Sequence, residues 1–147
     1  MMTGANKRGR CACGKVGFTA ALPSDKVVLC HCPQCKQRTG SAFGIMVYFP
    51  EENLQFSKEF LQIYDYLADS GNKMQSHFCQ QCGTSLFLTG TINQGLVGVA
   101  GGCFDDVRFW YGIDREIFCR SKAPFVEVDA DVSLETSPRY GSVKPPI

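Results

Sequence analysis

The chain has 147 residues, of which 44% are hydrophobic and 20% are charged. It is therefore long enough for one globular domain with a buried core, and too apolar for an intrinsically disordered protein. Fifteen basic and fourteen acidic residues give a formal net charge of +1 without any block of like charge, so neither nucleic acid nor a membrane surface is an expected partner.

Short runs of β-branched and aromatic residues, separated by Gly, Pro, Asn and Asp, predict strands joined by tight turns. The expected strands are Lys15–Ala20, Lys26–Cys32, Ala42–Phe49, Phe60–Leu67, Lys73–Phe78, Ser85–Thr89, Gly95–Ala100 and Glu116–Arg120. Helical turns are expected only at Pro33–Arg38 and Pro50–Leu54, because proline is tolerated at a first helical position. The pattern predicts a single mostly β domain over residues 1–147, with a core at about 8–130 and a proline-containing tail at about 133–147.

The first ten residues include basic side chains but no apolar run, and no stretch has the ~18 consecutive apolar residues of a membrane span. We therefore expect a cytoplasmic protein. Disulfides are rare in that reducing compartment, where clustered cysteines more often bind metal or carry out chemistry. The chain has nine cysteines, so their arrangement is the main chemical signal.

Seven of the nine cysteines fall into three short clusters. These are Cys11-Ala12-Cys13-Gly14, Cys30-His31-Cys32-Pro33-Gln34-Cys35 and Cys79-Gln80-Gln81-Cys82-Gly83. A structural zinc takes four protein ligands, whereas a reactive zinc keeps three and leaves one position for water or substrate. Seven ligands therefore suggest two zinc ions per chain, one of each kind.

The spacing favours a particular division of these ligands. In extended chain, residues i and i+2 project to the same face, so Cys11 with Cys13 can present two sulfurs together. The C-x-x-C-G segment needs a sharp turn, for which Gly83 can adopt a positive φ. We predict that Cys11, Cys13, Cys79 and Cys82 hold a structural zinc. Cys30, Cys32 and Cys35 then form a three-sulfur site for a catalytic zinc.

Other interpretations remain open at this stage. Cys32 and Cys35 could join Cys79 and Cys82 as in a zinc ribbon, which leaves three sulfurs over. Thiolate sets also accept iron, as in rubredoxin-type and iron–sulfur sites. A disulfide framework is disfavoured by the odd cysteine count and the expected compartment.

The clusters and the segments around them resemble the glutathione-dependent formaldehyde-activating enzyme family, also called the S-(hydroxymethyl)glutathione synthase family, which includes relatives of centromere protein V. The segments that carry the resemblance are Cys11–Phe18, Cys30–Phe43, Phe78–Thr84, Phe104–Asp106, Ile117–Phe118 and Ser121–Phe125. The resemblance implies a β-tent fold with the same two zinc sites. It also implies a carbon–sulfur lyase acting on a thiol–aldehyde adduct such as that of glutathione and formaldehyde. The chain departs from the family at Glu116, where histidine is common, and at Phe125, where tryptophan is common.

Three thiolates give a zinc site a net charge near −1, which makes it a poor generator of hydroxide but a suitable site for a further sulfur. A small thiol such as glutathione is therefore the expected guest, together with an aldehyde. Glutathione has two carboxylates, for which Lys36, Arg38 and Lys122 are candidate partners, with Arg120 as a further cation.

The remaining candidates receive mainly structural interpretations. His31 lies between two ligands but projects to the other face, which favours packing or hydrogen bonding over ligation. His77 is expected to have a hydrogen-bonding or core role, and Cys103 and Cys119 are expected to be inert thiols. Phe43, Tyr48 and Trp110 are more often core residues than pocket residues.

The sequence also allows a function other than catalysis. The chain could be a non-catalytic zinc-binding module for a protein partner, in which the three-cysteine set is an incomplete site. The number of zinc ions per chain, and the response of one of them to added thiol, would separate the two. The sequence leaves the true substrate and the oligomeric state open.

Overall fold

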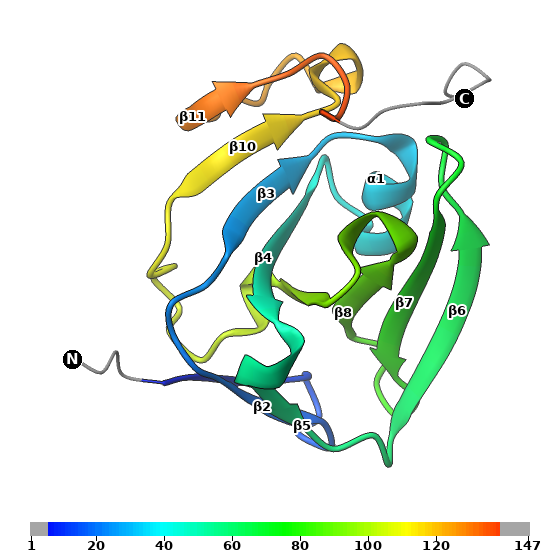
Figure 1. The fold of residues 1–147 in the computed structure, drawn as a ribbon, viewed down its shortest axis with the longest axis vertical. Coiled ribbons are helices and arrows are strands. Elements are labelled where there is room, and N and C mark those ends of the chain that lie inside the picture. Colours follow the sequence, from blue (N-terminus) through cyan, green and yellow to red (C-terminus); the bar gives the residue numbers. More distant parts are fainter. Residues whose placement is uncertain (1–5, 139–147) are drawn as a thin grey trace.

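The computed structural model describes residues 6–138, and within them eleven strands form two sheets (Figure 1). The small antiparallel sheet has the order β1 (Lys7–Arg10), β2 (Gly17–Ala20), β5 (Leu54–Phe56). The large sheet has the order β11 (Ala130–Ser133), β10 (Ile113–Ile117), β3 (Lys26–Cys30), β4 (Gly44–Pro50), β9 (Leu96–Ala100), β8 (Ser85–Gly90), β7 (Lys73–Cys79), β6 (Leu61–Leu67). Its pairs are antiparallel except at β10, which runs parallel to both neighbours.

The described residues contain one α-helix, α1 (Pro33–Thr39), and four short 3-10 turns. The turns are Glu51–Asn53, Thr91–Asn93, Gly101–Cys103 and Cys119–Ser121. Pro33 occupies the first turn of α1, where its missing N–H is not needed. The prediction of a mostly β single domain with little helix is thus confirmed.

The structure differs from the predicted elements at both ends of the chain. The predictions missed β1, because three of its four residues are Lys, Arg and Arg and it shows no apolar alternation. They also missed β5 and β11, whereas the helical turn predicted at Pro50–Leu54 is present as the 3-10 turn Glu51–Asn53. The strand predicted at Glu116–Arg120 begins earlier, as β10, and its second half is a 3-10 turn. Residues 139–147 of the predicted tail lie outside the described residues, while Leu134 donates its N–H to the Glu116 carbonyl.

Alternation along β4 separates two hydrophobic clusters on the two faces of the large sheet. Val47 and Phe49 belong to the cluster shared with the small sheet, which also contains Phe18 of β2. Met46 and Tyr48 belong to a second cluster on the opposite face. Period-two alternation places neighbouring residues on opposite faces, so one strand supplies both clusters.

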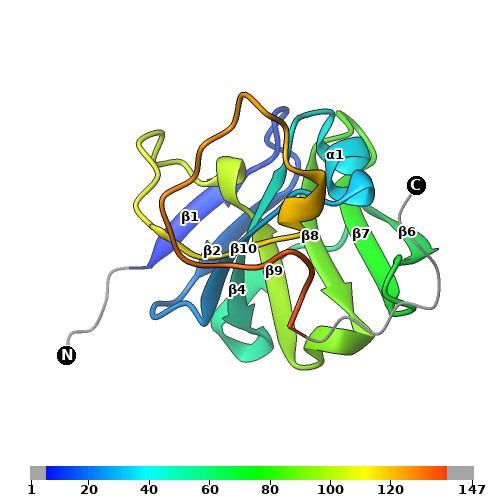
Figure 2. The same ribbon diagram turned by 90° about the horizontal axis from the view of Figure 1, so that it is seen from above.

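Figure 2 shows the small-sheet strands β1 and β2 on one side of the molecule and β6 and β7 on the other. Helix α1 lies near the β6–β7 end, where Gln34 donates to the Leu67 carbonyl over 3.0 Å and accepts from the Asp69 N–H over 3.2 Å. Among residues 6–138, no helix has the length and hydropathy required to cross a bilayer.

Candidate metal centres and the adjoining cavity

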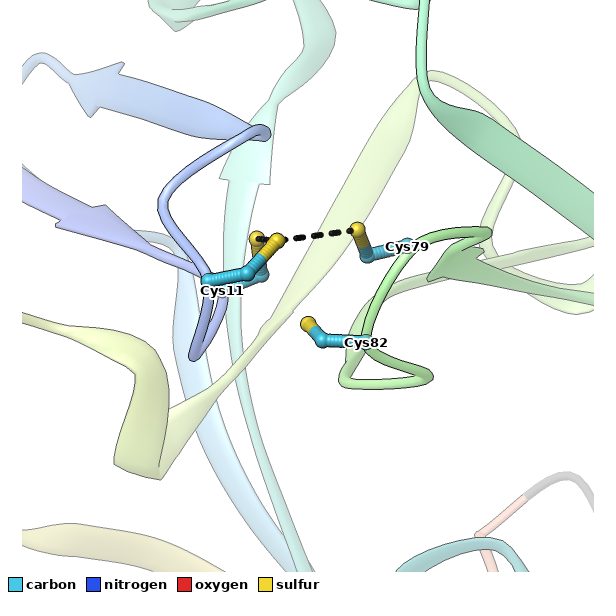
Figure 3. Close-up of side chains that lie close together, drawn as sticks. Cys11, Cys79 and Cys82 are labelled. Carbon is cyan, nitrogen blue, oxygen red and sulfur yellow. Dashed lines mark hydrogen bonds between the residues drawn. The ribbon is translucent and has the colours of Figure 1, made fainter.

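The sulfurs of Cys11, Cys13, Cys79 and Cys82 converge within 4.8 Å of one another, and we call this group the four-cysteine site. Figure 3 shows Cys11 facing Cys79 and Cys82 across a small gap. The Cys11–Cys13 and Cys13–Cys79 sulfur distances are 3.6 and 3.7 Å. A tetrahedron with zinc–sulfur bonds of ~2.3 Å has sulfurs ~3.8 Å apart. The donor set therefore fits a closed zinc site.

Two glycine turns bring these sulfurs together. Gly14 and Gly83 have φ values of +82° and +80°, and a side chain rarely adopts such a conformation. Backbone N–H groups then point at sulfur, with Val16 donating to Cys11 over 3.3 Å and Gln81 donating to Cys79 over 3.4 Å. Hydrogen bonds to sulfur favour the thiolate form, which is the form that binds metal.

Thr84 links the two halves of the four-cysteine site. Its hydroxyl accepts the Ala12 N–H over 3.1 Å and lies 3.2 Å from the Cys82 sulfur. The hydrogen bond with this hydroxyl is the main cause that lowers the pKa of the Cys82 thiol to about 5. At neutral pH, Cys82 is therefore ready to bind a metal ion.

Cys30, Cys32 and Cys35 form a separate group, the three-cysteine site, whose sulfurs also lie within 4.8 Å of one another. Cys32 is the N-cap of α1, and its sulfur accepts the Cys35 N–H over 3.4 Å. All three side chains are buried. Among residues 6–138, no fourth Cys, His, Asp or Glu joins the group. The structure thus gathers the seven sulfurs in the two sets that the spacing predicts, and the zinc-ribbon partition is wrong.

The nine cysteines carry no disulfide. Both cysteine sets could therefore hold zinc, with four ligands in one and three in the other. At the three-cysteine site, hydrogen bonds from Cys30 and Cys32, together with the charge of Arg38, hold the pKa of the Cys35 thiol well below its usual range.

The Arg38 guanidinium lies close to Cys35, and the residue is half-buried. Its Nε and Nη2 atoms are buried and have no hydrogen-bond partner among the described residues. A buried guanidinium requires a compensating negative charge. The Cys35 thiolate supplies that charge. If zinc binds the three cysteines, Arg38 would also offset the net negative charge of that site.

His31, which directly follows β3, points away from the three sulfurs and toward Glu116 of β10. Its Nε2 lies 2.7 Å from a carboxylate oxygen of Glu116, and both side chains are almost fully buried. Lys122 binds the same oxygen at 2.8 Å, and Ser133 donates to the other oxygen at 2.8 Å. Burial alone would raise the pKa of Glu116, but the hydrogen bonds, first that from Lys122, lower it to about 2.

His31 and Glu116 also lie close to Cys119, in a third cluster of possible metal ligands. The contacts of Glu116 with Lys122 and Ser133 already occupy both of its oxygens. This cluster is therefore better described as a hydrogen-bonded support that fixes the backbone between Cys30 and Cys32.

The other predicted residues have contacts of their own. Lys36 donates to the Ser121 carbonyl, and Arg120 pairs with Asp69 at 3.3 Å. His77 bonds the Thr89 hydroxyl over 3.0 Å and is not among the metal-binding groups.

A cavity of about 240 Å³ adjoins the three-cysteine site, and all three cysteines line it. The further lining residues include Val28, Met46, Tyr48, Tyr66, Met74 and Leu88, which come from five strands of the large sheet. The register explains their convergence, because Met46 pairs with Val28 and Tyr66 pairs with Met74. Burial raises the pKa of both tyrosines, so their phenols stay neutral.

Little in the sequence indicates this cavity. Tyr48 was considered as a pocket residue, but the two methionines and Leu88 lie far apart in the chain and have ordinary core composition. Trp110 and Phe43 are elsewhere: Trp110 packs edge-on against Phe104 at 5.3 Å, and Phe43 packs against His31 at 6.0 Å.

Comparison with known proteins agrees with this geometry. The model of the glutathione-dependent formaldehyde-activating enzyme family matches residues 6–121, which is most of the chain. The chain belongs to this family. None of the curated proteins matches it. A crystal structure of a Rhodobacter sphaeroides protein shares its fold with 22% identity and a TM-score of 0.56, covering 68% of this chain and 89% of that one.

Proposed function

We propose that the chain is a zinc-dependent enzyme of the carbon–sulfur lyase class, similar to S-(hydroxymethyl)glutathione synthase, that makes or breaks a thiol–aldehyde adduct. The observation that carries the proposal is the three-cysteine site. Three buried cysteine sulfurs converge at the end of a cavity, beside the buried Nε and Nη2 atoms of Arg38 and without a fourth ligand among the described residues. Family membership supports the same reaction class.

Cys30, Cys32 and Cys35 would hold the catalytic zinc, which when bound favours the thiolate form of a coordinated thiol at neutral pH. In the forward direction, a carbon–sulfur bond forms between the thiol sulfur and the carbonyl carbon. The π electrons of the C=O bond move to oxygen, and the proton lost by the thiol is returned to that oxygen through solvent. The reverse reaction breaks the same bond and restores thiol and aldehyde.

The other residues around the three-cysteine site hold its cysteines in place and set the polarity of the cavity. Arg38 offsets the negative charge of the three thiolates, and the Glu116–His31 pair fixes the backbone that bears two of them. Tyr48 and Tyr66 are neutral hydrogen-bond donors in the cavity. The apolar walls limit water near the reacting atoms, which strengthens electrostatic interactions there.

Lys36, Arg38 and Lys122 remain the sequence-based proposal for the carboxylates of glutathione, and glutathione and formaldehyde remain the family-based substrates. The cytoplasmic location likewise stays a prediction.

The decisive experiment measures thiol–aldehyde exchange by NMR line shape. Wild-type protein and Cys32→Ser are compared with glutathione and formaldehyde, and with glutathione and phenylacetaldehyde. We expect wild type to accelerate at least one exchange, and Cys32→Ser to lose the acceleration together with one zinc. A wild-type protein that contains two zinc ions and accelerates neither exchange would overturn the proposal in favour of a non-catalytic zinc module.

A further inference from the structure

The cavity beside the three-cysteine site has mostly apolar walls. Its apolar lining includes Val28, Met46, Met74, Leu88, Ile92 and Leu96. These side chains sit on the face of the large sheet that does not contact the small sheet, so the small sheet does not fill the space between them. A sulfur bound by the three cysteines would therefore have its substituent next to apolar surface.

The size of the cavity exceeds what a formaldehyde adduct needs. An apolar cavity of ~150 Å³ in another protein binds benzene, and this cavity measures about 240 Å³. A hydroxymethyl group has only a carbon and an oxygen outside its hydrogens, so it would leave most of the space unfilled. A larger group gains more from burial, because the hydrophobic effect increases with the apolar area removed from water.

The charges around the cavity do not favour a peptide with two carboxylates. Asp25 and Asp69 line it together with Lys26 and Arg115, so the signs balance. Placing an unpaired carboxylate against the apolar walls would be strongly unfavourable.

The cations predicted for glutathione lie elsewhere. Lys36 donates to the Ser121 carbonyl, Lys122 pairs with Glu116, and Arg38 faces Cys35. These three cations are not among the residues that line the cavity.

We infer that the cavity takes an uncharged apolar organic group, of benzyl size or larger, borne by the thiol or by the carbonyl carbon of the adduct. This inference rests on the proposed function for the position of the sulfur, and it narrows the substrate class beyond formaldehyde. Any polar part of the thiol then extends out of the cavity.

Calorimetric titration of the zinc-loaded protein separates the contributions of the sulfur and of the apolar group. The probes are benzyl mercaptan, 2-mercaptoethanol and benzyl alcohol. We expect benzyl mercaptan to bind at least tenfold more tightly than 2-mercaptoethanol, because only the first fills the cavity. We also expect it to bind more tightly than benzyl alcohol, because only a thiol suits the three-cysteine site.

A matched pair of variants locates the binding. Ala68 lines the cavity, whereas the neighbouring Leu67 is 58% exposed. Ala68→Phe should fill part of the cavity and reduce the advantage of benzyl mercaptan over 2-mercaptoethanol by at least fivefold. Leu67→Phe should leave that advantage unchanged. If Ala68→Phe fails to fold, the comparison of the three probes on wild-type protein still tests the inference.

A second pair of ligands tests whether the apolar group belongs to the thiol or to the carbonyl carbon. The glutathione adduct of phenylacetaldehyde carries the group on the carbonyl carbon, whereas benzyl mercaptan carries it on the thiol. A gain over the corresponding small ligand, the formaldehyde adduct or 2-mercaptoethanol, supports the inference and identifies the source.

Two negative outcomes are distinguishable. Equal binding of benzyl mercaptan and 2-mercaptoethanol, with no gain for the phenylacetaldehyde adduct, overturns the inference about the cavity. The inference about the cavity is also overturned if benzyl mercaptan binds more tightly than 2-mercaptoethanol and Ala68→Phe does not reduce that advantage. Equal binding of benzyl mercaptan and benzyl alcohol instead argues against thiol binding, and therefore against the proposed function.

Discussion

The two cysteine sites differ in how they use the chain. The four-cysteine site joins the turn after β1 to the end of β7, with Cys13 and Cys79 separated by 66 positions. The three-cysteine site takes all its ligands from residues 30–35, at the end of β3 and the start of α1. An ion in the first site therefore closes a long loop and ties distant strands together, whereas an ion in the second closes only a short local one.

They differ also in exposure. Cys13 and Cys82 are exposed, while Cys30, Cys32 and Cys35 are all buried and line the cavity. Burying thiolates without gaining a long-range connection contributes little to folding. The comparison supports our proposal that the first site would stabilise the domain and that the second would supply the chemistry.

The largest expected effect is that of Cys79→Ser at the four-cysteine site. Apparent zinc affinities of structural sites are ~10–16 kcal/mol, whereas a whole domain is stable by only ~5–15 kcal/mol. We expect insoluble protein or a molten state without a cooperative thermal transition, measured by near-UV circular dichroism and scanning calorimetry. Cys103→Ser, at a cysteine outside both sites, is the control. A Cys79→Ser protein that lacks the metal and still melts cooperatively near wild type would remove the distinction between the sites.

Cys32→Ser tests the other half of the comparison. Serine is a good helix N-cap, so α1 should still begin at Pro33. We expect the zinc content measured by elemental analysis to fall by one ion per chain while a cooperative transition remains. The loss of stability should be about 3 kcal/mol, the contribution of a ligand present at ~100 times its dissociation constant. Complete unfolding of this variant would show that both sites are structural.

Glu116→Gln examines the support behind the three-cysteine site. It leaves Lys122 and His31 with a weaker partner, and we expect a loss of about 1–3 kcal/mol in urea unfolding at neutral pH. Asp131→Asn, at an exposed position of β11, should change stability little.

The pH dependence of this effect has a defined sign. The folded-state pKa of Glu116 is lowered from 4.5 to about 2. The ionised carboxylate thus stabilises the fold fully above pH 4.5, and this contribution is lost as the pH falls toward 2. The stability difference between wild type and Glu116→Gln should therefore shrink across that interval. A difference that stays constant would show that the carboxylate has no special role.

Gly83→Ala should have the smallest effect. Its added methyl group meets no atom within 4 Å, so the positive φ of 80° is the cause of any cost. A left-handed conformation costs an alanine roughly 1–2 kcal/mol. We expect faster zinc transfer to a chelator from the four-cysteine site, followed by absorbance. Gly102→Ala, which has equal space and no positive φ, is the control, and equal transfer rates in the two variants would contradict this account of the turn.

Cysteine spacing was enough to predict which cysteine sulfurs lie together, since cysteines two or three residues apart share a local turn or strand face. The same alternation predicted that His31 faces away from Cys30 and Cys32. The positive φ of Gly83 was also predicted, because a C-x-x-C turn restricts the backbone after its second cysteine. These features depend on a few bonds along the chain, and the sequence specifies them directly.

The partner of His31 and the function of Arg38 could not be predicted in this way. Glu116 is 85 positions from His31, and it was noted only because it departs from the family pattern. Arg38 is predicted to bind a substrate carboxylate, and the closeness of its charge to the Cys35 thiol was not predicted. Whether a cation is exposed or buried depends on what the rest of the fold packs over it.

The sequence by itself determined that this is a small, mostly β protein whose clustered cysteines gather as one group of four and one group of three. Only the tertiary structure decided that the three cysteines end an apolar cavity, because its walls come from strands between Lys26 and Ile117 that the register of the large sheet brings together. Ligand sets follow from local geometry, whereas the space beside them depends on which distant side chains the sheet places on one face.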